Sequence, residues 1–223
     1  MKKPAAAAKK KVLIVDDHPM MREGLAQLLD HEPDLCACCQ ADNATQAMAS
    51  VAKTRPDLAL VDISLPDKSG LELIKDLHSM HPGVPILVVS MHDETLYAER
   101  VLRAGGRGYI MKQEGGKKLM QAIRQVLNGQ IYVSEKMSAK ILELFSGHRA
   151  ATTNSPIEKL SDREFEVFQL IGQGQGTREI AQHLHLSVKT VEVHRANMKQ
   201  KMQLKTGAEL VRFAIRWTDA QKP

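Results

Sequence analysis

The stretch "KVLIVDDHP", residues 11–19, decides the fold class of the first part of the chain. An apolar run leads into two adjacent carboxylates, Asp16 and Asp17, and Pro19 follows two residues later. An apolar run without polar alternation is typical of a strand that is buried on both faces. Proline suits the first turn of a helix, because its missing N–H is not needed there. The stretch therefore predicts a buried strand that ends in charged residues and leads into a helix.

The same order of strand and helix repeats along the first part of the chain. Short apolar runs recur in "LCACC", "DLALVD", "PILVVS" and "GYIM". Helical spacing of apolar residues is found in five segments: 19–30, 43–54, 69–79, 93–104 and 116–128. Strands that alternate with helices predict a parallel sheet covered on both sides. We therefore expect a doubly wound α/β domain over residues 11–130.

The charge of the chain changes sign along its length. The net charge is +5 in a composition of 43% hydrophobic and 26% charged residues. Five lysines of residues 1–11 account for +5, residues 12–157 carry −3, and residues 158–223 carry +3. This change predicts two parts with different partners. No apolar run approaches the roughly 18 residues that span a bilayer, so we expect no membrane segment, a disordered Lys/Ala-rich tail over 1–10, and a cytoplasmic protein.

Three cysteines lie close together in "LCACCQ" as Cys36, Cys38 and Cys39. Metal sites built on cysteine use a Cys-x-x-Cys pair or a following pair of histidines, and neither is present. We therefore interpret the three residues as small apolar side chains of a buried strand.

The second part of the chain is predicted to be helical and separated from the first by a linker over 131–157. This linker holds a modest helical stretch from Lys136 to Phe145 and a breaker-rich segment after it. In "LSDRE", Ser161 and Glu164 form a capping box that starts a helix. The segments "TREIAQHL", "HLS" and "VKTVEVHRANMKQKM" then predict a helix, a turn and a longer helix, and "AELVRFAIRW" a last one. A short turn between two helices is the geometry of a helix-turn-helix DNA-binding unit.

Polar residues stand at matching ends of the predicted strands. Asp16 and Asp17 end the first strand, Asp62 the third and Ser90 the fourth, and Lys112 follows the fifth. In an open parallel sheet, ligands bind beyond the carboxyl ends of the strands. Carboxylates that converge there repel one another, and carboxylate oxygens suit Mg²⁺. The pattern predicts a Mg²⁺ site next to a hydroxyl and an ammonium that can contact a phosphoryl group.

Residues 11–130 resemble the receiver domain of two-component response regulators. Beyond the acids, Pro66 and Gly70 follow Asp62 at the family spacings of four and eight residues, and Tyr109 precedes the lysine by three. The resemblance implies a flavodoxin-like sheet with five parallel strands in the order 2-1-3-4-5.

The resemblance also implies a role for each residue of the cluster. Asp62 is implied to be the phosphoacceptor, which takes a phosphoryl group from a phosphohistidine of a sensor histidine kinase. Asp17, Asp62 and the backbone carbonyl of Ser64 are implied to hold Mg²⁺. Asp16 would act through a water molecule, and Lys112 would contact the phosphoryl oxygens.

Two further residues are implied to form a switch. After phosphorylation, the Ser90 hydroxyl would move to bond the phosphoryl group, and Tyr109 would rotate inward into the vacated space. The surface near the fourth helix and the fifth strand would then change shape. The alternative for Tyr109, a half-buried packing aromatic, stays open.

Residues 158–217 resemble the LuxR-type helix-turn-helix domain of the NarL/FixJ class of response regulators. The matching segments are "LSDREFEVFQLIGQG", "REIAQHL", "TVEVHRANMKQKM" and "AELVRFA". The pattern departs at Gly176, where family members often carry a Ser or Asn helix cap. We place the whole domain at 158–218.

The long helix of this second domain has two distinct faces. Val191, Met198 and Met202 fall on one side and are expected to point inward. Three residues of the other side are assigned to base readout: Glu192, Val193 and Ala196. Six more are assigned mainly to phosphate or flanking contacts: Lys189, Thr190, Arg195, Asn197, Lys199 and Lys201. The alternative is an ordinary solvated helix face.

The last helix carries more apolar surface than a small domain needs. Four of its residues are candidates for a dimer contact: Leu210, Phe213, Ala214 and Trp217. Dimers that bind paired half-sites are common for helix-turn-helix proteins.

The leading hypothesis is a regulator of transcription that is switched by phosphorylation and is not an enzyme. Its expected partners are a sensor histidine kinase, double-stranded promoter DNA and a second copy of the chain, with RNA polymerase as a further candidate and no membrane. A second hypothesis is a Mg²⁺-dependent phosphatase or phosphotransferase with an aspartate nucleophile. Enzymes of the haloacid-dehalogenase type carry a second acid two residues after that nucleophile, where this chain has Ser64. A third hypothesis is a DNA-binding protein whose receiver-like domain is never phosphorylated.

Overall fold

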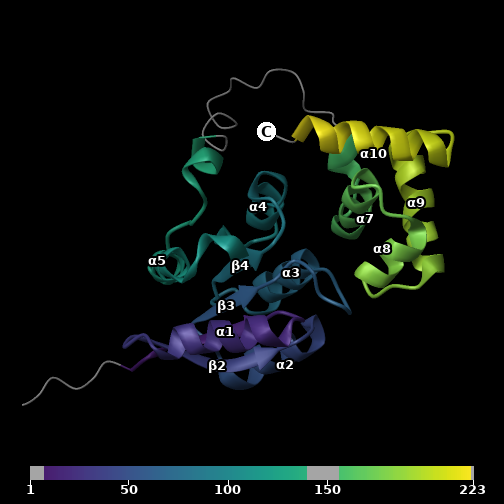
Figure 1. The fold of residues 1–223 in the computed structure, drawn as a ribbon. Helices are drawn as coiled ribbons and strands as arrows, with labels where there is room; N and C mark the ends of the chain where they lie inside the picture. Colours follow the sequence, from purple (N-terminus) through teal and green to yellow (C-terminus); the bar gives the residue numbers. More distant parts are fainter. Residues whose placement is uncertain (1–7, 140–155, 222–223) are drawn as a thin grey trace, which may run out of the picture. The chain divides into compact units, whose positions relative to one another are not determined.

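The computed structural model describes residues 8–139 and 156–221. The chain divides into two compact units, Met1–Gly147 and His148–Pro223, and each is described by itself. Figure 1 shows a sheet with helices around it in the first unit and helices in the second. Within the described parts of the chain, no helix is long and apolar enough to cross a membrane.

The first unit is a five-stranded parallel sheet in the order β2-β1-β3-β4-β5, as predicted. Its strands are β1 (Lys10–Val15), β2 (Leu35–Ala41), β3 (Leu58–Val61), β4 (Ile86–Ser90) and β5 (Gly108–Met111). Its helices are α1 (Pro19–Asp30), α2 (Ala44–Thr54), α3 (Gly70–Met80), α4 (Glu94–Arg103) and α5 (Gly116–Leu127), and a short 3-10 turn, η1 (Lys112–Glu114), precedes α5. Because β1 starts at Lys10, the last residue of the predicted tail belongs to the strand.

The core of this unit lies on both faces of the sheet. Apolar residues of α1 and α5 share one cluster with side chains of the sheet, including Ile14 and Leu60. Helices α2, α3 and α4 contact one another in sequence order along the other face. The strands β1 and β3 lie side by side, with Val15 paired to Val61. Their carboxyl ends are therefore adjacent, which brings the residues that follow them together.

The edge strand β2 carries the three cysteines and a β-bulge. Val12 of β1 pairs with Ala37, whereas the next residue, Leu13, pairs with Cys39, so Cys38 is the extra residue. The prediction that the cysteines are buried is wrong, since all three are half-buried. The reason is the position of β2, which has a neighbouring strand on one side only.

The opposite edge of the sheet is covered by the chain that follows α5. The backbone carbonyl of Tyr132 accepts a hydrogen bond from the Tyr109 N–H (2.8 Å), and the Tyr132 N–H donates to the Arg107 carbonyl (3.0 Å). Gly108 permits this approach, because a Cβ atom there would lie 2.7 Å from the Tyr132 carbonyl oxygen. Such pairing satisfies backbone groups of an edge strand that would otherwise be open.

A buried carboxylate of α4 holds the next part of this segment. Glu94 is 8% exposed and accepts the Ser134 N–H at 2.7 Å. Ser134 in turn caps the helix that follows, because its hydroxyl accepts the Met137 N–H at 3.2 Å. Residues 135–139 are helical, and Met137 is fully buried. The remainder of the short helix predicted up to Phe145 lies outside the described residues.

The second unit is helical, as predicted. Its elements are η2 (Pro156–Lys159), α7 (Asp162–Gly172), α8 (Thr177–His183), α9 (Val188–Lys201) and α10 (Gly207–Gln221). The core packs α10 against α7, where the ring of Phe168 meets those of Phe213 and Trp217 at centroid distances of 6.0 and 5.5 Å. Gly172 makes the close approach possible, since a Cβ atom there would lie 2.8 Å from the Ala214 carbonyl oxygen.

The helix starts of this unit use reciprocal capping. The Ser161 hydroxyl accepts the Glu164 N–H (3.3 Å), and the Glu164 carboxylate accepts the Ser161 N–H (2.8 Å), which confirms the predicted capping box. At the start of α8, Gly176 has no side chain to cap with. Of the two bonds of a capping box, one is present there: the Gly176 N–H donates to Glu179 Oε2 at 2.6 Å.

The carboxylate of Glu164 should contribute to stability in a pH-dependent way. It is buried, and besides the cap it accepts a 2.6 Å bond from Lys201 Nζ. Burial raises the pKa of Glu164, but the bonds from Lys201 and Ser161 outweigh it and lower the pKa below its usual value. A carboxyl with a lowered pKa stabilises the folded state at neutral pH, and this contribution is lost as the pH falls.

We expect Glu164→Gln to destabilise the second unit by about 1–2 kcal/mol at neutral pH, since a charge-assisted cap is lost. The gap to the wild type should close below the usual carboxyl pKa. Denaturant unfolding, followed by the fluorescence of Trp217, the one tryptophan of the chain, measures this unit. Glu99→Gln, on the surface of the other unit, is the matched control. A gap that stays constant with pH would contradict the assignment.

Candidate functional site

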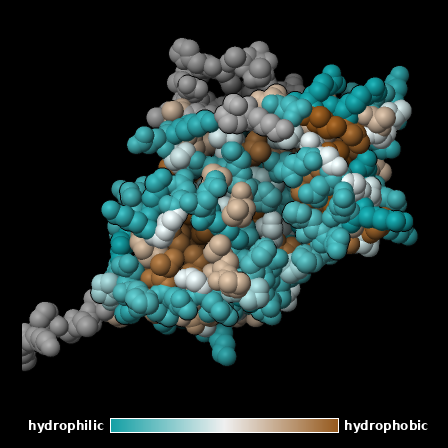
Figure 2. Space-filling view, in the orientation of Figure 1, coloured by the Kyte–Doolittle hydropathy of each residue, from teal (hydrophilic) through white to brown (hydrophobic). Residues whose placement is uncertain are grey.

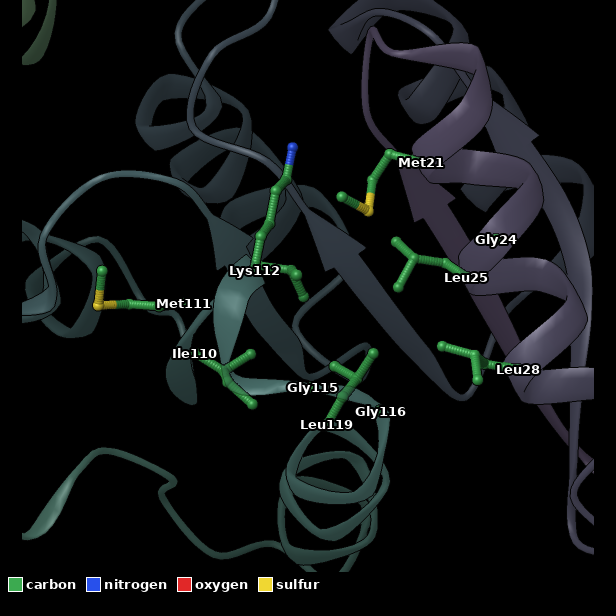
Figure 3. Close-up of a pocket in the computed structure, with 11 residues that line it drawn as sticks. Met21, Gly24, Leu25, Leu28, Ile110, Met111, Lys112, Gly115, Gly116 and Leu119 are labelled. Carbon is green, nitrogen blue, oxygen red and sulfur yellow. The ribbon is translucent and has the colours of Figure 1, made fainter.

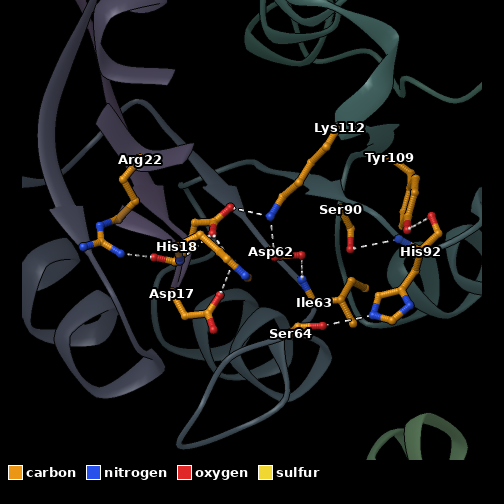
Figure 4. Close-up of polar contacts among 11 residues, drawn as sticks. Asp17, His18, Arg22, Asp62, Ile63, Ser64, Ser90, His92, Tyr109 and Lys112 are labelled. Atoms are coloured by element: carbon orange, nitrogen blue, oxygen red, sulfur yellow. Dashed lines mark hydrogen bonds and ion pairs between the residues drawn. The ribbon is translucent and has the colours of Figure 1, made fainter. Parts of the chain in front are cut away.

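Two aspartates and a lysine meet at the carboxyl edge of the sheet (Figure 4). Asp16 follows β1, Asp62 follows β3, and Lys112 follows β5. Lys112 Nζ lies 2.6 Å from Asp16 Oδ2 and 2.6 Å from Asp62 Oδ2. All three side chains are at most 4% exposed. Three residues that stand far apart in the sequence thus form one buried charged cluster, as the strand ends predicted.

The loop after β3 shapes this cluster through a glycine. The Gly70 N–H donates to the Ile63 carbonyl at 2.7 Å, which brings the start of α3 back onto the end of β3. A Cβ atom on Gly70 would lie 2.1 Å from the Asp62 carbonyl oxygen, closer than any side chain can come. Glycine is therefore required here for close packing of two backbones.

The charges of the cluster do not balance. Burial raises the pKa of Asp62, the charge of Lys112 lowers it, and the nearby carboxylate of Asp16 raises it again, so that the pKa lies above its usual value. Burial alone would lower the pKa of Lys112, but the two carboxylates outweigh it and raise that pKa. Two buried carboxylates thus face one ammonium, and the remaining negative charge favours a further cation.

A divalent metal fits the donor groups at this edge. One ligand atom from each of Asp16, Asp17, His18 and Asp62 can be chosen so that all lie within 4.8 Å of one another. Three carboxylates are hard oxygen donors of the kind that Mg²⁺ prefers. His18 is held by the acids, with Nδ1 2.6 Å from Asp17 Oδ1 and 3.3 Å from Asp16 Oδ1. Sequence reasoning missed His18, although it directly follows the two aspartates.

A second histidine links the groups on the other side of Asp62. The Ser90 side chain is fully buried, and its hydroxyl acts to lower the pKa of the Asp62 carboxyl. The backbone of His92 accepts the Tyr109 hydroxyl at 2.8 Å and donates to Ser90 Oγ at 3.4 Å. Its ring lies 3.0 Å from Ser64 Oγ. His92 was also missed, and its place two residues after Ser90 was the available signal.

Tyr109 already points inward in this structure. Its side chain is 1% exposed, so it is fully buried and not half-buried. Burial raises the pKa of the Tyr109 hydroxyl, which stays protonated and donates to the His92 carbonyl. The Tyr109 hydroxyl and Ser90 Oγ both bond to the backbone of His92, near Asp62 (Figure 4).

In the second unit, helix α9 presents an exposed face. Val191 and Met198 are fully buried and Met202 is 7% exposed, which confirms the predicted inward stripe. The other face bears the residues assigned to base readout, which are exposed: Glu192, Val193 and Ala196. Of the residues assigned to phosphate or flanking contacts, three are exposed (Lys189, Asn197 and Lys201) and three half-buried (Thr190, Arg195 and Lys199). Lys201 differs from the rest, because its ammonium pairs with Glu164 of the same unit.

The dimer candidates on α10 are used inside their own unit. Leu210 and Ala214 are fully buried, so they are not available to a second chain. Phe213 and Trp217 are half-buried and make ring contacts with α7. The sequence prediction is wrong for Leu210 and Ala214, because the apolar stripe of α10 covers α7.

Comparison with known proteins agrees with both units. Residues 12–124 match the family described as response regulator receiver domain, and residues 158–214 match the bacterial regulatory proteins of the luxR family. Oxygen regulatory protein NreC of Staphylococcus carnosus is 36% identical over 210 residues, which cover 92% of this chain and 97% of that protein. The chain is a member of the response-regulator family.

Solved structures of response regulators resemble this one. A LuxR-family two-component response regulator from Aurantimonas sp. SI85-9A1 is 29% identical, with a TM-score of 0.58 over 62% of this chain and 99% of that one. A structure of two RcsB dimers bound to two parallel DNAs is 25% identical, with a TM-score of 0.56 over 92% of this chain and 98% of that one.

An apolar cavity of about 290 Å³ opens beside the acid cluster of the response regulator. Figure 3 shows that Met21, Leu25 and Leu28 of α1 face Ile110 and Leu119 across it. Figure 2 shows hydrophobic side chains gathered among a mostly hydrophilic surface. The carbon stem of Lys112 forms part of the cavity wall, and its ammonium leaves the cavity toward the aspartates (Figures 3 and 4). Apolar contacts thus support the stem while the charge stays in the cluster.

We expect Lys112→Ala to destabilise the receiver unit by about 3–5 kcal/mol in the absence of divalent metal, because it leaves two buried carboxylates without a cation. Asp62→Asn removes one of those charges and should be at least as stable as the wild type. Added Mg²⁺ should stabilise Lys112→Ala and should stabilise Asp62→Asn less than the wild type. Calorimetry with EDTA or Mg²⁺ measures this order. A Lys112→Ala variant that equals the wild type in EDTA would contradict the charge account.

Proposed function

We propose that this response regulator accepts a phosphoryl group on Asp62 from a sensor histidine kinase, and that phosphorylation controls dimerisation and transcription at target promoters. The observation that carries the proposal is the buried cluster of Asp16, Asp62 and Lys112 on the same chain as an exposed helix α9. The cluster suits a phosphoryl group, and the helix suits a DNA groove.

In the proposed reaction, a carboxylate oxygen of Asp62 attacks the phosphorus of the kinase phosphohistidine. The phosphorus–oxygen bond forms, the phosphorus–nitrogen bond breaks, and its electron pair returns to the imidazole. Lys112 is placed to neutralise charge on the phosphoryl oxygens. Asp62 must be ionised for the attack, and Lys112 favours that form. The buried Ser90 hydroxyl is placed to donate to the new phosphoryl group.

Mg²⁺ is the proposed cofactor. Bound Mg²⁺ would offset negative charge on the transferring group and on the carboxylates. Asp17, Asp62 and the backbone carbonyl of Ser64 are the proposed ligands, with Asp16 acting through water. His18 is left out of this set, since Mg²⁺ prefers oxygen donors.

We infer a stoichiometric phosphoacceptor and not an enzyme. Where haloacid-dehalogenase-like enzymes carry a second acid, the Ser64 hydroxyl bonds to the His92 ring instead. One retained phosphoryl group per chain would support the regulator, whereas continuous turnover of phosphoesters would support an enzyme.

The proposed organisation follows the two matched families. We assign 10–130 to the receiver domain, 131–157 to the linker and 158–218 to the DNA-binding domain, after a tail over 1–9. The proposed location is the cytoplasm, where the kinase, the promoter DNA, a second copy of the chain and RNA polymerase are the partners. The RcsB structure with DNA-bound dimers supports the proposal that this chain binds DNA as a dimer.

Helix α9 is proposed to enter the major groove. Glu192, Val193 and Ala196 would face the base edges, because they lie on the exposed side opposite the buried stripe. Five further side chains are proposed to hold phosphates or flanking positions: Lys189, Thr190, Arg195, Asn197 and Lys199. Lys201 is left out, since its charge is paired with Glu164.

The signal is proposed to leave the pocket through α4. Glu94 starts this helix two residues after His92, whose backbone holds Tyr109 and Ser90. The buried carboxylate of Glu94 binds the Ser134 N–H at the first turn of the linker helix. A shift in the loop before α4 would therefore act directly on the start of the linker.

Acetyl phosphate with Mg²⁺ should add one phosphoryl group per wild-type chain by intact mass, and none to Asp62→Asn. Asp76→Asn, on the surface of α3, is the control and should be labelled. Full labelling of Asp62→Asn would overturn the assignment of the acceptor.

Beryllofluoride with Mg²⁺ should raise the affinity for DNA sites selected from a random pool in the wild type but not in Asp62→Asn. The affinity should fall steeply with salt, because phosphate contacts release counterions. Unchanged DNA affinity and dimerisation with beryllofluoride would favour a protein whose receiver is never phosphorylated.

Glu94→Ala should separate phosphorylation from output. Losing a hydrogen bond to a charged group costs roughly 1.5–3 kcal/mol, so amide exchange at Ser134 should rise by about tenfold or more. Labelling at Asp62 should persist, and the beryllofluoride effect on DNA binding should fall several-fold. Glu99→Ala, which removes an ion pair with Arg103 within α4, is the control. Wild-type exchange and a wild-type DNA response would contradict this path.

A further inference from the structure

Two adjacent cysteines at the bulge of β2 bring their sulfur atoms together. Neighbouring side chains in a regular strand point to opposite faces of the sheet. At the bulge this alternation is broken, because Cys38 and Cys39 both stand opposite the single residue Leu13. Their Sγ atoms are 3.2 Å apart, and Cys39 Sγ lies 3.3 Å from the Thr54 hydroxyl. The result is a half-buried dithiol on one face of an edge strand.

The third cysteine provides an internal comparison. Cys36 lies two residues earlier on the same strand, and its Sγ atom lies 3.6 Å from the Lys10 carbonyl oxygen. In a strand without a bulge, Cys36 and Cys38 would share a face, and Cys38 and Cys39 would not. Which two sulfurs act together therefore depends on the bulge.

A disulfide between Cys38 and Cys39 is disfavoured on two grounds. Adjacent Cα atoms are about 3.8 Å apart, below the roughly 4.4–6.8 Å of ordinary disulfides, so the bond would be strained. Burial raises the pKa of the Cys38 thiol to about 12. The thiolate that attacks oxidants is therefore scarce at neutral pH.

A site for a transition metal with three or four protein ligands is also disfavoured. Zinc sites use three or four protein ligands in a tetrahedral arrangement. Among the residues that the structure describes, the one group of at least three His, Cys, Asp or Glu ligand atoms lies at the acid cluster of Asp16. The dithiol has the Thr54 hydroxyl beside it. It therefore suits an atom that binds two sulfurs and already carries its third substituent.

We propose that Cys38 and Cys39 form a two-sulfur site for trivalent organic arsenicals. In the reaction with an arsine oxide, two arsenic–sulfur bonds form and the arsenic–oxygen bonds break. The two thiol protons leave with that oxygen as one water molecule. Arsenic stays trivalent, so no oxidant or reductant is needed, and the neutral thiols lose their protons only as the bonds form.

The site lies close to the phosphorylation pocket along the same pair of strands. Two residues after Cys39, β2 ends at Ala41, whose carbonyl accepts the Asp16 N–H at 3.1 Å. A bridge between the two sulfurs would hold the bulge at a short distance from the acid cluster. The inference does not depend on phosphorylation, and its test is independent of the proposed function.

Phenylarsine oxide and four forms of the full chain test the proposal: the wild type, Cys36→Ser, Cys38→Ser and Cys39→Ser. Intact mass spectrometry under native conditions should show one adduct per chain for the wild type and for Cys36→Ser. The adduct should persist in excess glutathione and be removed by 1,2-ethanedithiol. Cys38→Ser and Cys39→Ser should bind at least tenfold more weakly.

The same titration in denaturant isolates the effect of the fold. In the unfolded chain, Cys36 and Cys38 can replace the native pair, so Cys39→Ser should regain binding. Calorimetry verifies that each variant is folded under native conditions. Native binding by Cys39→Ser equal to the wild type, or loss of binding in Cys36→Ser, would overturn the proposal.

Discussion

Repulsion between two buried carboxylates governs the carboxyl edge of the sheet. Because β1 and β3 are neighbours, Asp16 and Asp62 cannot separate, and water cannot solvate them at 3–4% exposure. Lys112 is 2.6 Å from both but supplies one positive charge against two negative ones. Further cationic charge at this site would favour the ionised form of both carboxylates. The excess negative charge explains why this edge suits a dication.

The two edge strands of the sheet differ in what covers them. At the β5 edge, Tyr132 pairs with the backbone, and Glu94 holds Ser134, so the start of the linker belongs to the receiver unit. Strand β5 carries Tyr109 and is followed directly by Lys112. The linker therefore pairs with a strand that supplies residues to the pocket. At the β2 edge, no such cover is present among the described residues, and a bulge interrupts the ladder. Bulges at sheet edges commonly limit further pairing and re-aim side chains.

The second unit combines a packed core with one largely exposed helix. Aromatic packing between α7 and α10 uses Phe168 and Trp217, together with the fully buried Leu210 and Ala214. Helix α9 buries only Val191 and Met198 in the described structure, so most of its surface remains exposed. Lys201 belongs to the stabilising set, because it pairs with the capping carboxylate of Glu164.

Local patterns in the sequence were enough to determine the elements and the type of sheet, and the strand order implied by the family resemblance completed the acid cluster. Runs without polar alternation indicate strands of a parallel sheet, and the ends of such strands meet at one edge, so Asp16, Asp62 and Lys112 could be placed together. The capping box of Ser161 and the inward stripe through Val191 were equally predictable, since both depend on residues within a few helical turns.

Only the tertiary structure decided which surfaces those elements leave open. The half-buried state of Cys38 follows from the edge position of β2, which depends on strand order and not on its own apolar residues. Leu210 is buried because its helix packs on a different helix. The ion pair between Lys201 and Glu164 and the hydrogen bond from Ser134 to Glu94 each join residues that are 37 or more positions apart. Periodicity identifies the apolar face of a helix or strand. It contains no information about which partner will cover that face, because the partner is chosen by packing across the whole fold.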